Sequence, residues 1–518
     1  MKRSTLSRSA LILCVFALLC SRSPVRAADE VRVATGVLEG TTGAKPGVRM
    51  FLGVPYAAPP VGDLRWKPPQ PAAKWTGVRK ATAFGNRCIQ TNAFADMVWR
   101  SPAESEDCLY LSIWTPAKSG AERLPVMFWI HGGGFFSGAS DEGRHEGSSL
   151  ASRGVVVVEI NYRLGVLGFF AHPELSAESP RKASGSYGLL DQVAALQWVR
   201  DNIAAFGGNP GNVTIFGESA GSFSVSALMA SPLTKGLFHK AIGESGAYFT
   251  SQRKPLARAQ AEALGAKFGE AMGAPSIAAL RAKTPAELVK AVGSNSGQFW
   301  PIIDGYCLTE DPWDTFAAGR QQPVPLLAGW NSAEIKSPQT TLANFTAQVK
   351  KQYPDDADAI LKVYGPGADA EARRSAVALA SDNFIGYNTW KWIEVHSATR
   401  KLPVYRYLFD QIFPTASGDP APDDPGAGHA SDIEYVFNAL EARKLAWRPA
   451  DRQVADLMGA YWTNFARTGN PNAAGLPNWP AWDASRQLMR INANAKAEAE
   501  AHRERYEVMD EIERRRRK

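Results

Sequence analysis

The segment Gly217-Glu218-Ser219-Ala220-Gly221 has the pattern G-x-S-x-G, and it separates two kinds of local sequence. The apolar run NVTIFG (212–217) before it predicts a buried strand, and a helical pattern follows from 219 to 229. A serine in this context stands on a sharp turn that exposes its hydroxyl as a nucleophile. Glycines on either side remove side chains that would collide in the turn, and the helix start adds positive potential near the reacting oxygen. We therefore predict that Ser219 is a nucleophile for acyl transfer.

The glycine run His131-Gly132-Gly133-Gly134 follows the apolar run LPVMFWI (124–130). Glycines let backbone N–H groups approach a substrate closely, so those of Gly133 and Gly134, with that of Ala220, could form a three-donor oxyanion hole. One such donor stabilises the transition state by roughly 3 kcal/mol. A phosphate-binding loop is the alternative, but no G-x-x-x-x-G-K-[ST] pattern follows.

Short apolar runs alternate with helical patterns along the chain. Runs at 124–131, 154–161 and 212–217 predict strands buried on both faces. Apolar residues recur at helical spacing over 188–206 and 219–229, and later at 255–272, 276–292, 370–381 and 451–467. This alternation predicts an α/β fold with a mostly parallel sheet covered by helices on both sides.

The first 27 residues have the features of a cleavable signal peptide. Basic residues near the start precede an apolar run at 10–19, which is too short to span a bilayer. Val25-Arg26-Ala27 offers small residues for cleavage after Ala27. Leu19 before Cys20 disfavours a lipid anchor, because lipidation needs a small residue there. We expect a secreted or periplasmic protein.

Charge and cysteine usage agree with export. The net charge is +7, but five basic residues and no acidic ones lie in residues 1–27, so 53 basic and 51 acidic residues remain. This gives no reason to expect a nucleic-acid partner. Cys88 and Cys108 enclose a short loop that an oxidising compartment would bridge, and Cys307 is expected to be a buried free thiol. No C-x-x-C or H-E-x-x-H pattern suggests a metal, and no later apolar run suggests membrane insertion.

The last part of the chain is rich in charge. Residues 415–428 contain many Pro, Gly and Asp residues and are expected to form a loop. Residues 496–518 carry eight Lys/Arg and seven Asp/Glu, which predicts a solvated helix or a frayed charged tail. A membrane-binding role for the basic run 514–518 is a weaker alternative.

The chain resembles the type-B carboxylesterase family, the cholinesterase-like branch of the α/β hydrolases. The resemblance runs in the family's order over about residues 30–480, and implies the α/β-hydrolase fold, a single catalytic domain at 28–495 and no cofactor. The matching stretches are FLGVPYAAPPVGDLRW (51–66), SEDCLYLSIWTP (105–116), HGGGFFSG (131–138), NYRLGVLGFF (161–170), YGLLDQVAALQWVRDNIAAFGGNPGNVTIFGESAG (187–221) and GHASDIEYVF (428–437).

The resemblance also assigns roles to residues. Ser219 matches the nucleophile, Glu334 in GWNSAE (329–334) the triad acid, and His429 the general base. Their chain order is that of α/β hydrolases. Asp304 in PIIDG remains a rival acid, because Ile335 follows Glu334 where the family often has glycine.

Further residues match secondary features of the family. Cys88 and Cys108 match its N-terminal disulfide. Glu218 lies beside the nucleophile and can tune the histidine, with Ser245 as a possible second contributor. Trp99 lies near the place of a choline-binding tryptophan in cholinesterases, although we do not predict a choline ester. Phe135, Phe136 and Phe299 are candidate pocket residues.

We expect a carboxylic ester hydrolase that acts on small to medium esters through a Ser-His-Glu triad and an acyl-enzyme intermediate. Lipase, thioesterase, amidase and lactonase activities remain alternatives on the same fold. A non-catalytic binding protein would lack Ser219 or the oxyanion glycines, and this chain has both. The sequence does not indicate an oligomeric state.

Overall fold

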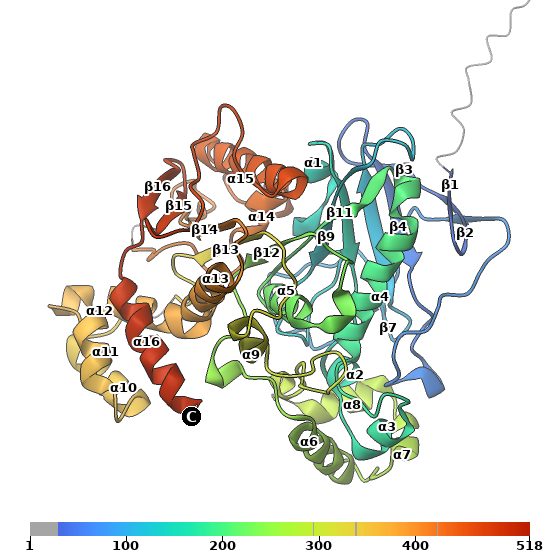
Figure 1. The fold of residues 1–518 in the computed structure, drawn as a ribbon, viewed down its shortest axis with the longest axis horizontal. Coiled ribbons are helices and arrows are strands. Elements are labelled where there is room, and N and C mark those ends of the chain that lie inside the picture. The colour runs from blue at the N-terminus through green and yellow to red at the C-terminus, as the bar shows by residue number, and fades with distance from the viewer. Residues whose placement is uncertain (1–29, 294, 337–338, 422, 518) are drawn as a thin grey trace, which may run out of the picture.

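A large twisted sheet forms the centre of the computed structural model, which describes residues 30–517 except 294, 337, 338 and 422 (Figure 1). The sheet has eleven strands. In spatial order they are β16 (Lys496–Ala499), β15 (Gln487–Ile491), β14 (Val404–Phe409), β13 (Leu326–Asn331), β12 (Lys240–Glu244), β11 (Gly208–Glu218), β9 (Leu124–Ile130), β10 (Val156–Ile160), β8 (Tyr110–Thr115), β4 (Arg49–Pro55) and β3 (Thr41–Thr42).

The strands from β10 to β15 pair in parallel, whereas β8, β4, β3 and β16 join antiparallel at the two edges. Every residue of β10 is buried, as expected for a β-branched run in the middle of a covered sheet. The predicted mostly parallel sheet is confirmed. It matters for the site because the carboxyl ends of parallel strands lie at one edge.

Successive side chains of a strand point to opposite faces, so the sheet supports two cores. In β9, Val126 and Phe128 pack into one core and Met127 and Trp129 into the other. The first core is covered by α4 (Tyr187–Asn202), α5 (Ala220–Ala230) and α13 (Tyr387–Thr399). The second is covered by α1 (Ser148–Ala151), α14 (Ile433–Val436) and α15 (Pro449–Thr468).

Most predicted helices are present, with one division. α4, α5, α15, α6 (Arg258–Ala271) and α12 (Asp369–Ser381) occupy their predicted positions. The helix predicted at 276–292 is two helices, α7 (Ile277–Arg281) and α8 (Pro285–Val292). The division follows from Thr284 and Glu287, which form a capping box, and from Pro285, which favours the first turn of a new helix.

The remaining elements surround the sheet. The other helices are α2 (Gly165–Phe169), α3 (Pro173–Glu178), α9 (Pro312–Ala317), α10 (Leu342–Gln352) and α11 (Ala357–Tyr364). Two small sheets join β1 (Glu30–Val33), β2 (Gly36–Glu39) and β5 (Val78–Lys80), and β6 (Arg87–Cys88) with β7 (Glu104–Ser105).

The C-terminal segment differs from the solvated tail that its charge predicted. β16 is the edge strand of the main sheet, and α16 (Arg503–Arg516) packs against α11 and α13 (Figure 1). Tyr506, Met509 and Ile512 are buried on one stripe of α16. This narrow stripe packs into the core, and charged residues cover the other sides of the helix. The composition of α16 therefore resembles that of a solvated, charged tail.

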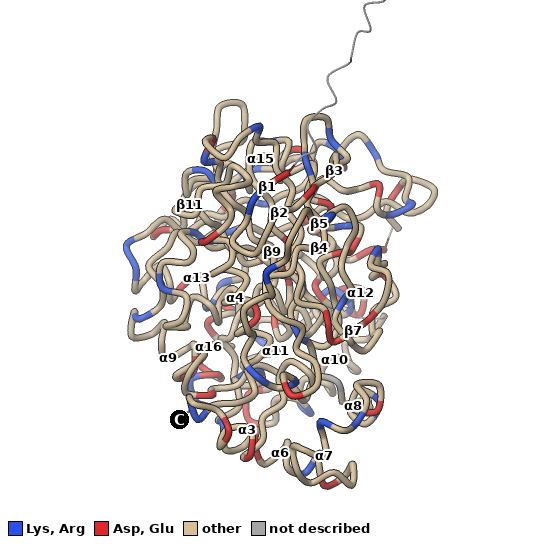
Figure 2. Tube along the Cα trace, turned by 90° about the vertical axis from the view of Figure 1, so that its right-hand side faces the viewer, with Lys and Arg blue, Asp and Glu red and all other residues tan. Residues whose placement is uncertain are grey.

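The signal peptide expected at residues 1–27 lies outside the described residues. Cys88 and Cys108 form a disulfide, and Cys307 is a buried free thiol. Within the described part of the chain, no helix combines the length and apolarity needed to cross a bilayer. Acidic and basic residues are interspersed along the trace in the view of Figure 2, in line with the small net charge of the chain after residue 27.

Candidate active site

Ser219 lies at the junction between β11 and α5, in a strained backbone conformation. Its φ is 53° and its ψ −119°, a region that residues other than glycine rarely adopt. The Ser219 N–H donates to Glu244 O at 2.9 Å, which ties the turn to β12. A Cβ added to Gly221 would lie 2.0 Å from Ile130 O, so the turn can pack against β9 only with glycine there. The strand-to-helix turn predicted around Ser219 is present.

Ser219, His429 and Glu334 lie in one chain of hydrogen bonds. Glu334 follows β13, and His429 lies in the loop before α14. His429 Nε2 is 2.9 Å from Ser219 Oγ, and its Nδ1 is 2.6 Å from Glu334 Oε2. The loops after β11, β13 and β14 thus bring together residues that are far apart in sequence. This is the geometry in which an imidazole can take a proton from a hydroxyl.

Two further groups hold the Glu334 carboxylate. The Asn331 N–H and the Ser245 hydroxyl donate to Glu334 Oε1 at 2.7 and 2.6 Å, leaving Oε2 for the histidine. Asp304, the rival acid, instead accepts three backbone N–H groups of its own turn at 2.8–3.1 Å. Glu334 is therefore the acid that contacts His429, and Ser245 donates a hydrogen bond to that acid.

The glycine run after β9 presents unpaired backbone donors beside Ser219. Among the described residues, the N–H groups of Gly133, Gly134 and Ala220 donate to no acceptor. Gly133 and Gly134 have φ values of 102° and 63°, and a Cβ on Gly133 would lie 2.2 Å from Ser137 O. The three residues predicted for the oxyanion hole thus have free donors: Gly133 and Gly134 in a loop that requires glycine, and Ala220 at the start of α5.

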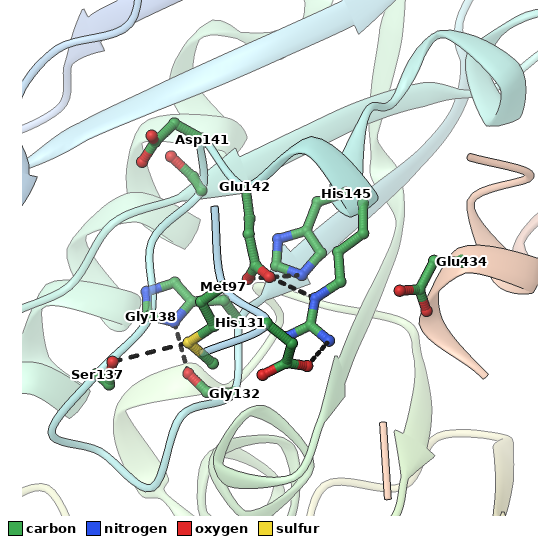
Figure 3. Close-up of polar contacts among 12 residues, drawn as sticks. Met97, His131, Gly132, Ser137, Gly138, Asp141, Glu142, His145 and Glu434 are labelled. Carbon is green, nitrogen blue, oxygen red and sulfur yellow. Dashed lines mark hydrogen bonds and ion pairs between the residues drawn. The ribbon is translucent and has the colours of Figure 1, made fainter. Parts of the chain in front are cut away.

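A buried polar cluster lies near this loop (Figure 3). Glu142 pairs with Arg144 at 2.5 Å and lies 3.6 Å from His145. His131 Nδ1 is 2.8 Å from Gly132 O. Burial lowers the pKa of His131 to about 4, so this histidine stays neutral and is occupied with the backbone of the loop. It is not a second candidate for the base.

Glu218 provides a second carboxylate beside His429. Its Oε1 is 3.4 Å from His429 Nε2, and its side chain is buried. Burial raises the pKa of Glu218 to about 8. Burial opposes the charged form of His429, but the carboxylates of Glu218 and Glu334 outweigh it and raise the pKa of His429 to about 9. Glu218 is therefore one of the carboxylates whose charge favours the protonated form of His429.

The candidate pocket residues have different surroundings. Phe135 contacts Phe169 and Trp300, and Phe136 stacks on Phe94. Phe299 packs against Phe170 and Phe268 in the core. The Trp99 ring lies 5.6 Å from the guanidinium carbon of Arg87, a cation of its own chain. None of these ring and cation contacts includes His429.

Sequence reasoning missed Phe384, whose ring packs edge-on against the His429 ring with 4.9 Å between centroids. Phe384 lies in a π-helical segment, Asp382–Gly386, between α12 and α13. Such segments are frequent at functional sites, but no short motif marks them in sequence. It also missed Asn331 and the buried Asp432, which Asn331 and Tyr407 bind through hydrogen bonds.

Comparisons with known proteins identify the family of this chain. The model of the carboxylesterase family matches residues 27–509. The chain is 37% identical to a fumonisin B1 esterase of Sphingopyxis macrogoltabida, over 95% of this chain and 92% of that protein. It is 35% identical to a human cocaine esterase, over 91% and 88% of the two chains. A solved PNB esterase structure superposes with a TM-score of 0.79 at 33% identity, covering 92% of this chain and 99% of the other.

The sheet, its helices and the superposition with PNB esterase define an α/β-hydrolase fold, as predicted. The chain belongs to the carboxylesterase family. It is an enzyme that hydrolyses carboxylic esters, which confirms the predicted class of activity.

Proposed function

We propose that the protein hydrolyses small to medium carboxylic esters through a covalent acyl-enzyme on Ser219. His429 takes the proton of the Ser219 hydroxyl as its oxygen attacks the ester carbonyl carbon. The tetrahedral intermediate collapses, the C–O bond to the alcohol breaks, and His429 returns the proton to that alcohol. Water, deprotonated by the same imidazole, then attacks the acyl carbon and releases the acid and Ser219.

The hydrogen-bond chain from Glu334 through His429 to Ser219 is the observation that carries this proposal. Glu334 orients the imidazole and stabilises its charged form after proton transfer. The free N–H groups of Gly133, Gly134 and Ala220 would stabilise the oxyanion, each by roughly 3 kcal/mol. Glu218 would set the pKa of His429, and Ser245 would position Glu334.

We also propose that the enzyme is exported and cleaved after Ala27, as its first 27 residues predict. The Cys88–Cys108 disulfide supports an oxidising compartment. Because β16 belongs to the main sheet, the catalytic domain would extend from residue 28 beyond the boundary at 495 that the sequence predicted. Sequencing the N-terminus of the exported protein tests the cleavage site.

The nucleophile is tested by covalent labelling. A fluorophosphonate should add one phosphonyl group to the wild type and none to Ser219→Ala, which should also lose turnover of 4-nitrophenyl butyrate. Ser152→Ala is the matched control, because Ser152 is an exposed serine whose hydroxyl donates to Ser149 O in its own turn. Circular dichroism checks that both variants fold. Labelling at another residue, or full turnover by folded Ser219→Ala, would disprove the assignment.

A further inference from the structure

The guanidinium of Arg253 is surrounded by aromatic rings. Its central carbon lies 5.6 Å from the ring centroid of Phe223, 5.3 Å from that of Trp300 and 5.0 Å from that of Phe384. Arg253 ends the short 3-10 helix Ser251–Arg253 and is half-buried. A guanidinium stacked on rings keeps its N–H donors in its own plane, where they can bind a planar anion.

Each of these rings contacts a different part of the candidate active site. Phe223 lies one turn into α5, and its N–H donates to Ser219 O at 2.9 Å. Trp300 contacts Phe135, the residue after Gly134, with 5.2 Å between centroids. Phe384 packs against the His429 ring. A single aromatic ring therefore separates the Arg253 guanidinium from the imidazole.

Arg253 has a charge but no acidic partner. In the described part of the chain, its side chain takes part in no ion pair and no hydrogen bond, whereas the buried Arg163 pairs with a carboxylate. Two neighbouring donors also lack acceptors: the buried Tyr248 hydroxyl, whose ring contacts Phe223, and Trp300 Nε1. Buried donors without acceptors are uncommon, and together these groups offer an acceptor-poor site for an anion.

A cavity of about 350 Å³ lies beside the Arg253 side chain. It is lined by Arg253, by Phe384 and by Ile335, the residue after Glu334. The amide side chains Gln252, Gln348 and Gln352 line it as well, and none of its described lining residues is Asp or Glu. The cavity is thus lined by Ile335, which follows Glu334 in the chain, and by Phe384, which packs against His429, and it has one cation with several neutral donors.

We propose that Arg253 is a specificity residue that binds a carboxylate carried by the ester substrate, away from the bond that is cleaved. The enzyme would then prefer esters with one free carboxylate, such as half-esters of dicarboxylic acids. This inference rests on the proposed hydrolysis at Ser219. The guanidinium matches a carboxylate with two parallel hydrogen bonds, and the surrounding rings exclude water that would weaken the ion pair.

The test compares two esters that differ in charge and in one methyl group: 4-nitrophenyl hydrogen adipate, which is an anion, and its neutral methyl-capped twin, 4-nitrophenyl methyl adipate. A second pair, 4-acetoxybenzoate and its methyl ester, places the carboxylate on the alcohol side. The readout is the ratio of kcat/KM for the anion to that for its twin. Wild type should favour the anion in at least one pair, and 0.5 M NaCl should reduce that ratio, because salt screens ion pairs.

Arg253→Gln should lower this ratio by about 10- to 100-fold, the range expected for losing hydrogen bonds to a charged group. Arg253→Lys should retain part of the preference. The control is Arg181→Gln, since Arg181 also faces an aromatic ring, that of Tyr306, but lines a different cavity. Arg181→Gln should leave the ratio unchanged.

Two outcomes would overturn the inference: a wild-type ratio near one in both pairs, or a ratio that Arg253→Gln leaves unchanged. Failure of the proposed function is separate, because it would appear as turnover of all four esters by Ser219→Ala. If Arg253→Gln does not fold by circular dichroism, Arg253→Lys and the salt dependence of the wild type still decide the question.

Discussion

Replacing Glu218 by Gln tests how the site sets the basicity of its histidine. The substitution keeps the size of the side chain and removes its charge. His429 works as a base only when neutral, so activity should rise with pH as this imidazole loses its proton. A nearby carboxylate raises the pKa of His429, and its loss should lower that pKa. The acid limb of the pH profile should therefore move to lower pH in Glu218→Gln.

The distance between the two groups gives the size of the effect. Unit charges 3.4 Å apart interact by about 5 kcal/mol at an effective dielectric constant of about 20, which is an upper limit here. Burial raises the pKa of Glu218 to about 8, so near neutral pH this carboxyl is only partly ionised and acts with part of that energy. We expect the acid limb to move down by about one to two pH units, since one unit corresponds to about 1.4 kcal/mol.

The assay is kcat/KM for 4-nitrophenyl butyrate between about pH 5 and about pH 10, which reports the free enzyme. Glu159→Gln is a matched control. Glu159 is another buried glutamate, in β10, with its pKa raised by burial, and it is not among the main charges that act on His429. The control profile should coincide with that of the wild type.

An acid limb that stays in place in Glu218→Gln would refute the reasoning, as would a shift to higher pH. A lower plateau with an unchanged midpoint would mean that Glu218 contributes hydrogen bonding or packing rather than charge.

Two further predictions concern stability. The double variant Cys88→Ser/Cys108→Ser should lower the free energy of unfolding by about 3 kcal/mol, because the unfolded chain regains the freedom of a loop of about 20 residues. Urea unfolding of both proteins, with and without a reductant, measures this loss. If the reductant destabilised the double variant as much as the wild type, that result would contradict the prediction. Tyr506→Ala should cost about 3–5 kcal/mol by leaving a cavity beneath α16, whereas Glu504→Ala on the exposed side should change the melting temperature little.

The central strands and the reactive turn could be predicted because several signals agree there. A mostly apolar, β-branched run such as VVVEI is most stable in the middle of a covered sheet. Gly221 after Ser219 and Gly133 after β9 are required because any side chain there would make contacts of 2.0 and 2.2 Å. Both glycines belong to short motifs, so the sequence alone marks them.

Features that depend on distant contacts could not be predicted. β16 has the sequence KAEA, which is a strand only because β15 lies beside it. The stripe of Tyr506, Met509 and Ile512 is too thin to distinguish α16 from a charged tail. Arg253 lies in SQRKP, an ordinary polar turn, and its three rings come from segments separated from one another by many residues.

The C-terminal helix has a consequence for engineering this enzyme. Glu513 in α16 accepts the backbone N–H of Ser251 at 2.5 Å, and Ser251 begins the turn that carries Arg253. Arg517 also pairs with Asp311 beside α9 at 2.8 Å. Fusions or deletions at this end would loosen the anchor of that turn. Choices made for convenience at the C-terminus, such as the placement of a purification tag, would then alter which esters the enzyme selects.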